Sequence, residues 1–211
     1  MERAARAELT SGPIHVNVAD TLLEGAWDSP PQPRGVVLFP HGRGTGRGAN
    51  DALFASKLRA AGLATLLLDL LSSREVDLDE RKAAFRFDMA LLTDRLAGAT
   101  DWLAEQPATL GLPIGYFGVG YAAEVATRAA TKRSNLVRAV VTHDALTDLA
   151  DQPLPRVPVP TLIISGISQL PSSKSDGPVI PYGPGPSVTV AQKPEEVARL
   201  AAEWFSKHLG P

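Results

Sequence analysis

The sequence contains no cysteine, and its 211 residues include only 4 histidines and 6% aromatic residues. Without cysteine the chain has no disulfide, no thiolate nucleophile and no cysteine metal site. No apolar stretch approaches the ~20 residues that span a bilayer, and no run of basic residues marks a nucleic-acid surface. The charged start, MERAARAEL, has no apolar signal core, so we expect a cytoplasmic protein without membrane or nucleic-acid partners.

Hydrophobic residues make up 44% of the chain and the net charge is −2. This length and composition predict a single domain over residues 1–211 with one sizeable core. Residues 1–34 are expected to supply N-terminal strands and a proline-rich connector. Residues 170–186 are rich in proline and glycine, which excludes a helix and predicts a loop that serves as a lid or as a partner-binding strip.

Short apolar runs alternate with helical patterns along most of the chain, which predicts an α/β fold with a doubly wound, mostly parallel sheet flanked by helices. The expected strands are residues 15–20, 22–27, 36–39, 63–71, 114–117, 136–141, 161–165 and 187–191. The expected helices are residues 50–61, 79–105, 122–132 and 194–209.

Seven segments in this order carry a family resemblance: VVLFPHGRGTGRG, GLATLLLDLL, RFDMALLTDRLAGATDWL, LPIGYFGVGYAA, LVRAVV, VPTLIISG and VARLAAEWF. The chain resembles the α/β-hydrolase fold over residues 35–209, and more narrowly the small dienelactone-hydrolase-like proteins. The resemblance implies a minimal cap and a Ser–His–Asp triad whose serine stands in a sharp strand-to-helix turn, with backbone N–H groups forming an oxyanion hole.

Each triad position departs from that pattern. The serine position falls on Gly120 in GYFGVGYA, the aspartate position falls near Ser168, and no histidine lies between His143 and His208. The mechanism needs an attacking oxygen, a base and a group that orients the base. We therefore expect no hydrolysis by the family mechanism. Glycine at position 120 is expected to keep the sharp turn, because glycine adopts such a backbone conformation with the least strain.

Ligands in open α/β sheets bind beyond the carboxyl ends of the strands. His41 and Gly42 follow one predicted strand and match the HG of the family's oxyanion loop; alternatively, His41 bonds only to local backbone. Arg43 and Arg47 lie in a glycine-rich loop that suits an anion, but the loop lacks the G-K-[ST] ending of a P-loop. No spacing of acidic residues and histidines indicates a metal, and we expect no cofactor.

Three further candidates follow two other strands. Tyr121 either binds a ligand or plugs the pocket, whereas Glu124, one turn later, is interpreted as a helix-surface charge. His143 and Asp144 form the most suggestive pair, because histidine titrates near neutrality and shuttles protons. The alternative is that Asp144 caps a short helix and His143 lies on the surface.

Three hypotheses follow. The first is a non-hydrolytic cyclase, isomerase or lyase acting on a small-molecule ligand by acid–base catalysis, of the kind used in specialised metabolism. Its expected catalytic residues are His143, Asp144, Tyr121 and His41, and its expected binding residues are Gly42, Arg43, Gly120 and Ser168. The second is a non-catalytic protein that binds a ligand or a partner. The third is residual hydrolysis through Ser165 or Ser168. The sequence leaves the oligomeric state open.

Overall fold

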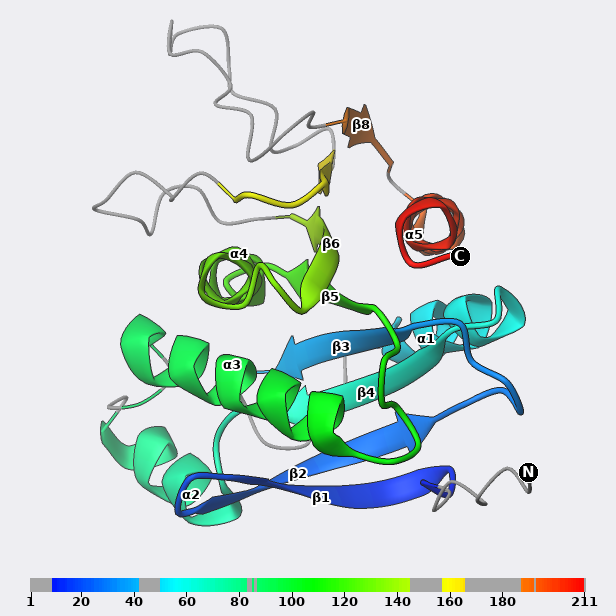
Figure 1. Ribbon diagram of the computed structural model, residues 1–211. Coiled ribbons are helices and arrows are strands. Elements are labelled where there is room, and N and C mark those ends of the chain that lie inside the picture. Colours follow the sequence, from blue (N-terminus) through cyan, green and yellow to red (C-terminus); the bar gives the residue numbers. More distant parts are fainter. Residues whose placement is uncertain are drawn as a thin grey trace, which may run out of the picture.

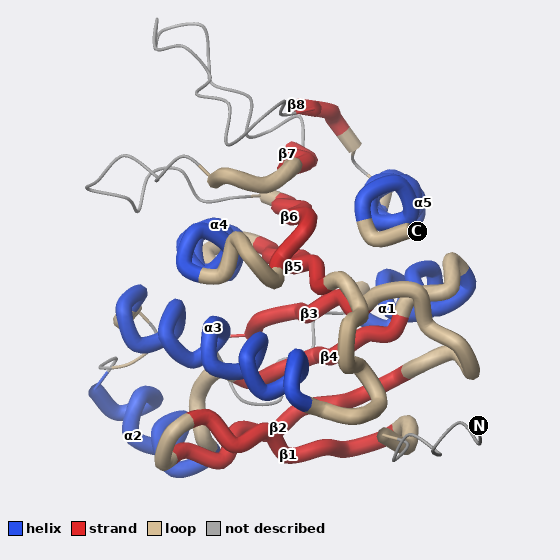
Figure 2. The backbone as a smooth tube through the Cα atoms, viewed as in Figure 1, coloured by secondary structure: helices blue, strands red, loops and turns tan. Residues whose placement is uncertain are grey.

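The computed structural model describes residues 9–41, 50–82, 85, 87–144, 157–165, 187–191 and 193–210. These residues form an eight-stranded sheet with helices on both faces (Figure 1, Figure 2). The strands are β1 (Gly12–Val18), β2 (Thr21–Asp28), β3 (Val36–His41), β4 (Ala64–Asp69), β5 (Ile114–Val119), β6 (Val137–His143), β7 (Thr161–Ser165) and β8 (Ser187–Val190). The helices are α1 (Asp51–Ala60), α2 (Ser73–Lys82), α3 (Met89–Glu105), α4 (Ala122–Lys132) and α5 (Pro194–His208).

The strand order is β1-β2-β4-β3-β5-β6-β7-β8. β2 is antiparallel to both of its neighbours, β1 and β4, whereas every pairing from β4 to β8 is parallel. The expected mostly parallel, doubly wound sheet is thus confirmed, and the expected N-terminal strands β1 and β2 pair as an antiparallel hairpin at its edge. All the parallel strands end at one edge, which is where such sheets place their sites.

Two apolar cores lie on opposite faces of the sheet. One contains Leu92 and Leu96 of α3 with Val125 and Ala126 of α4. The other contains Phe54 and Leu58 of α1 with Val197 and Phe205 of α5. The central strands contribute alternate side chains to each core, because successive side chains of a strand point to opposite faces. The parity of a residue in its strand therefore fixes which pair of helices it meets.

The prediction of a single helix over residues 79–105 was wrong, because α2 ends at Lys82 and α3 begins at Met89. Asp88 stands at the amino end of α3, where its carboxylate accepts a hydrogen bond of 2.9 Å from the backbone N–H of Leu91. Such a cap starts a new helix. Asp79, near the end of α2, accepts a hydrogen bond of 2.7 Å from the backbone N–H of Phe85, in the connection between the two helices.

Several expectations fall on residues that are not described, namely Gly42, Arg43, Arg47, Ser168 and the loop over residues 170–186. Within the described part of the chain, no helix combines the length and the apolar character needed to cross a membrane.

Candidate functional site at the strand ends

The carboxyl ends of β3, β5 and β6 meet at one edge of the sheet. β3 and β5 pair in parallel from Val36 and Ile114, and at the end of β5 Val119 lies opposite His143. His41 ends β3 and His143 ends β6. The fold therefore places one histidine on each side of the strand that leads into Gly120.

Gly120 forms the turn between β5 and α4. Its φ is +60°, and its backbone N–H donates a hydrogen bond of 2.9 Å to the carbonyl oxygen of His143. No described atom would lie within 4 Å of a Cβ added at this position. The family's sharp turn is thus present with open space above it, and glycine is the residue that adopts this φ with least strain.

His143 lies close to Asp144, with 3.4 Å between its Nε2 and a carboxylate oxygen. The imidazole is mostly buried, and its ring lies nearly perpendicular to that of Phe54 of α1. Burial lowers the pKa of His143 below 6.5, although the Asp144 carboxylate opposes this. Asp144 has a φ of +47°, a conformation that aspartate tolerates better than most residues. The imidazole is therefore neutral near pH 7 and is able to accept a proton.

We expect the His143 imidazole to titrate below pH 6.5, and its midpoint to fall further in Asp144→Asn, because that variant loses the charge that favours protonation. NMR titration of the ring protons measures both values. The lowered folded-state pKa also predicts that folding stability decreases as the pH falls from 6.5 toward that pKa, because the unfolded state binds the proton more readily. An unchanged midpoint in Asp144→Asn would contradict the electrostatic contact.

His41 forms a second pair with a carboxylate. Its Nε2 lies 2.8 Å from a carboxylate oxygen of Asp51, the buried first residue of α1. The interpretation of His41 as a residue that bonds only to local backbone does not account for this contact. Phe54, one turn further along α1, faces His143, so the first turn of this helix contacts both histidines. Sequence reasoning missed Asp51, although an acidic residue at a helix start was visible in the sequence.

Tyr121 is not brought together with the histidines. Its side chain packs against the core on the α3 and α4 face, whereas the contacts of His41 and His143 with α1 place them on the other face. Glu124 is also not the surface charge expected from sequence: it is buried and pairs with Arg128 at 2.6 Å. The described geometry thus unites His143 with Asp144 and His41 with Asp51.

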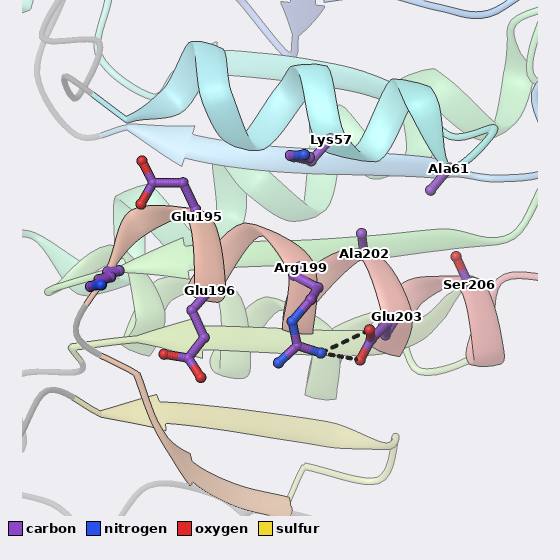
Figure 3. Close-up of a pocket in the computed structure, with 9 residues that line it drawn as sticks. Lys57, Ala61, Glu195, Glu196, Arg199, Ala202, Glu203 and Ser206 are labelled. Atoms are coloured by element: carbon purple, nitrogen blue, oxygen red, sulfur yellow. Dashed lines mark hydrogen bonds and ion pairs between the residues drawn. The ribbon is translucent and has the colours of Figure 1, made fainter.

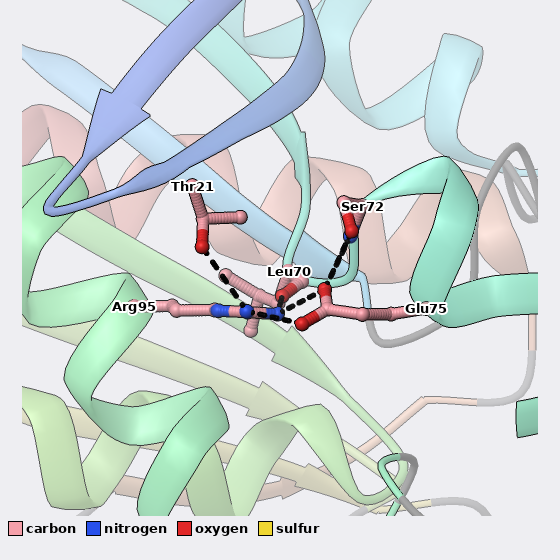
Figure 4. A network of polar contacts seen from close by, with 5 residues as sticks. All are labelled: Thr21, Leu70, Ser72, Glu75 and Arg95. Atoms are coloured by element: carbon pink, nitrogen blue, oxygen red, sulfur yellow. Dashed lines mark hydrogen bonds and ion pairs between the residues drawn. The ribbon is translucent and has the colours of Figure 1, made fainter. Parts of the chain in front are cut away.

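A largely buried ion pair anchors α2 beside the same edge of the sheet (Figure 4). The Arg95 guanidinium donates to both carboxylate oxygens of Glu75, at 2.6 and 2.7 Å, and to the carbonyl oxygen of Leu70 at 2.7 Å. Ser72 donates two more hydrogen bonds to Glu75. The hydrogen bonds from Arg95 lower the pKa of Glu75 from 4.5 to about 2. With every charge paired, we interpret this network as structural.

A wide groove of about 860 Å³ runs between α1 and α5 (Figure 3). Its side chains are mostly charged and exposed, and the Arg199–Glu203 pair lies within α5 at 2.8 Å. It contains neither of the histidine pairs. Its lining residues Lys57 and Ala61 belong to the carboxyl-terminal end of α1, whereas Asp51 begins that helix. We therefore do not place the chemistry in this groove.

No protein-family model matches the chain. The structure of a dienelactone hydrolase from Anabaena variabilis is 34% identical, with 95% of this chain and 98% of that chain covered and a TM-score of 0.80. The chain belongs to the dienelactone hydrolase family. The α/β-hydrolase fold expected from the sequence is thereby confirmed. The Est1E structure from Butyrivibrio proteoclasticus, 11% identical, has a TM-score of 0.70 over 93% of this chain and shows the same fold alone.

Two curated proteins from strains of Mycobacterium tuberculosis are also similar to this dienelactone hydrolase family member. Each is 38% identical over the whole chain and carries the name "Putative phosphoribosyl transferase". The chain spans about half the length of these relatives. Their name describes a protein that is twice as long as the part that aligns here.

Proposed function

We propose that this chain is a non-hydrolytic enzyme that moves protons on a small organic molecule, as a cyclase, isomerase or lyase. The observation that carries the proposal is the pair of histidine–carboxylate contacts at the ends of β3 and β6, on either side of Gly120. Histidines oriented by carboxylates are the usual general acids and bases. The glycine offers no oxygen to attack a carbonyl, so covalent catalysis by the family route is not part of the proposal.

In the proposed reaction His143 is the base. Its neutral imidazole accepts a proton from a carbon next to a carbonyl group, and the electron pair of the broken C–H bond moves onto the carbonyl oxygen. The amino end of α4 begins two residues after Gly120, and a helix amino terminus stabilises developing negative charge. His41, whose imidazole contacts the Asp51 carboxylate, then donates a proton to the substrate.

Deuterium uptake tests this proposal. Acetylacetone, ethyl acetoacetate and dihydroxyacetone are incubated with the protein in D₂O, and loss of their exchangeable C–H signals is followed by ¹H NMR. We expect the protein to accelerate exchange of at least one of these carbon acids. His143→Gln should slow the catalysed exchange by about 100-fold or more, which is the typical contribution of a general base.

His208→Gln is the matched control. His208 also has a pKa lowered by burial, but its ring packs against Trp204 within α5 at a tilt of 50°, with ring centroids 4.3 Å apart. Exchange should be unchanged in this variant. Equal rates for wild type and His143→Gln, or no acceleration with any of the three compounds, would count against an acid–base enzyme.

A non-catalytic binding unit is the second candidate, and one observation favours it. The mycobacterial relatives are twice as long as their match to this chain, and they are named for a transfer reaction. A unit of this fold would then support the activity of the other half of such a protein. Its test is the transferase activity of the longer relative with and without the half that aligns here. Loss of activity on removal supports this candidate, and full activity opposes it.

A further inference from the structure

Four polar side chains form a row across neighbouring strands at the hairpin end of the sheet. His15 of β1 lies opposite Glu24 of β2, and Asp69 of β4 lies opposite His41 of β3. β2 and β4 pair with Gly25 opposite Leu68, so Glu24 comes level with Asp69. The order across the sheet is therefore histidine, glutamate, aspartate, histidine, over the adjacent strands β1, β2, β4 and β3 (Figure 1).

All four side chains lie on one face. The alternate residues Val16, Leu23 and Leu68 point into the core beneath α3, so their neighbours along each strand face the other way. His41 reaches Asp51 of α1 on that other face. The row was not visible in the sequence, because strand register brings its members level, and His15 was not among the expected site residues.

The row lines a cavity of about 390 Å³. The remaining lining residues are Pro13, Ile14, Gly25, Ala26 and Leu67, which supply an apolar wall. This volume lies in the range of small-molecule sites, which combine apolar walls with a few convergent polar groups. The cavity reaches His41 and is thus continuous with one of the two histidine pairs at the strand ends.

Polar contacts position Glu24 and His41. Ser73 donates a hydrogen bond of 2.6 Å to Glu24, and Asp51 contacts His41 at 2.8 Å. No lysine or arginine is among the described lining residues, whereas two carboxylates are. Carboxylates only accept hydrogen bonds, and they repel anions. Among the described residues no three acidic or histidine side chains come together closely enough for a metal, so the acceptors suit a molecule that extends along the row.

We infer that this cavity binds a small, non-anionic molecule with several hydroxyl or amino donors, of the size of an amino sugar. The inference rests on the proposed function and deepens it, since it names the class of substrate that would reach His41. Donors of the molecule bind Glu24 and Asp69, while its carbon skeleton lies on Leu67 and Ala26. An anionic analogue of the same size is rejected by the carboxylates.

Glucosamine and gluconate test the inference, because both are six-carbon polyhydroxy compounds of similar size and their charges are opposite in sign. Binding is followed by the NMR shifts of the His15 and His41 imidazole signals during titration of the wild-type protein. Glucosamine should shift both signals along a saturable curve, and gluconate should bind at least tenfold more weakly. Glu24→Gln should weaken glucosamine about tenfold, as expected for a hydrogen bond to a charged group.

Ser73→Ala provides a second variant, since it leaves Glu24 in place but removes its positioning hydrogen bond. It should weaken glucosamine about two- to threefold, the lower end of what a hydrogen bond contributes, because Ser73 acts on the ligand only through Glu24. Glu203→Gln removes an exposed carboxylate outside the cavity and should change nothing. Gluconate binding as tightly as glucosamine, or unchanged glucosamine affinity in Glu24→Gln, overturns the inference. These readouts do not use deuterium exchange, so the inference and the acid–base function fail separately.

Discussion

Replacing Glu75 with glutamine is expected to lower the free energy of unfolding by about 3 kcal/mol, as is typical when one partner of a buried ion pair is removed. The Arg95 side chain is 8% exposed and that of Glu75 is 20% exposed, so water replaces little of the lost interaction. Arg95 would keep its bond to the carbonyl of Leu70 but lose its counter-charge. Urea unfolding of the two proteins at pH 7 measures the difference.

The same ion pair makes the free energy of unfolding depend on pH under acidic conditions. Because the pKa of Glu75 is lowered from 4.5 to about 2, its carboxylate contributes stability above pH 4.5, and this contribution is lost as the pH falls toward 2. The difference between wild type and Glu75→Gln should therefore stay constant above pH 4.5 and shrink below it. A difference that does not change with pH would show that the carboxylate charge is not the cause.

Glu203→Gln is the control for this experiment. Glu203 pairs with Arg199 one turn earlier on α5, and both side chains are more than half exposed. Exposed pairs contribute at most about 1 kcal/mol. Adding Arg95→Met to Glu75→Gln should restore part of the lost stability, because it removes the unpaired buried charge.

Gly118→Ala is expected to destabilise the fold by about 3 kcal/mol or more, through overpacking that no side-chain rotation relieves. A Cβ at this position would lie 2.6 Å from the carbonyl oxygen of Ala122 and 2.6 Å from the Cα of Ala123. These are backbone atoms of the first turn of α4, so the helix itself would have to move. The melting temperature and the urea midpoint report the effect.

Gly120→Ala distinguishes crowding from backbone strain. It adds the same methyl group two residues later, where no described atom lies within 4 Å, but at a φ of +60°. Only the strain of that conformation remains, which costs about 1–2 kcal/mol. If Gly118→Ala were no more damaging than Gly120→Ala, the close approach of α4 to β5 would not explain the first glycine.

The strand elements were predictable because their signal is local. Continuous apolar runs such as residues 36–39 and 114–117 occur where a parallel strand is buried on both faces, and all eight expected strands appear in the sheet. The break between α2 and α3 was not predicted, since helical spacing of apolar residues continues across it. The carboxylate of Asp88 ends that continuity by capping α3, and capping depends on side-chain geometry that periodicity does not report.

The candidate site was predictable only in part. His41, His143 and Asp144 were found from their places after strands, but their geometry was not. Asp51 follows a glycine-rich stretch of sequence, and its contact with His41 depends on where α1 begins. The row from His15 to His41 depends on strand register, which joins residues that are far apart in the chain.

The first turn of α1 contacts His41 through Asp51 and His143 through Phe54. The positions of the two imidazoles therefore depend on the same helical turn, although the histidines belong to different strands. A displacement of that turn changes the hydrogen bond of one and the apolar surroundings of the other together. A ligand that shifts this turn would change the proton affinity of both imidazoles. By thermodynamic reciprocity, protonation of either imidazole would change the affinity for that ligand.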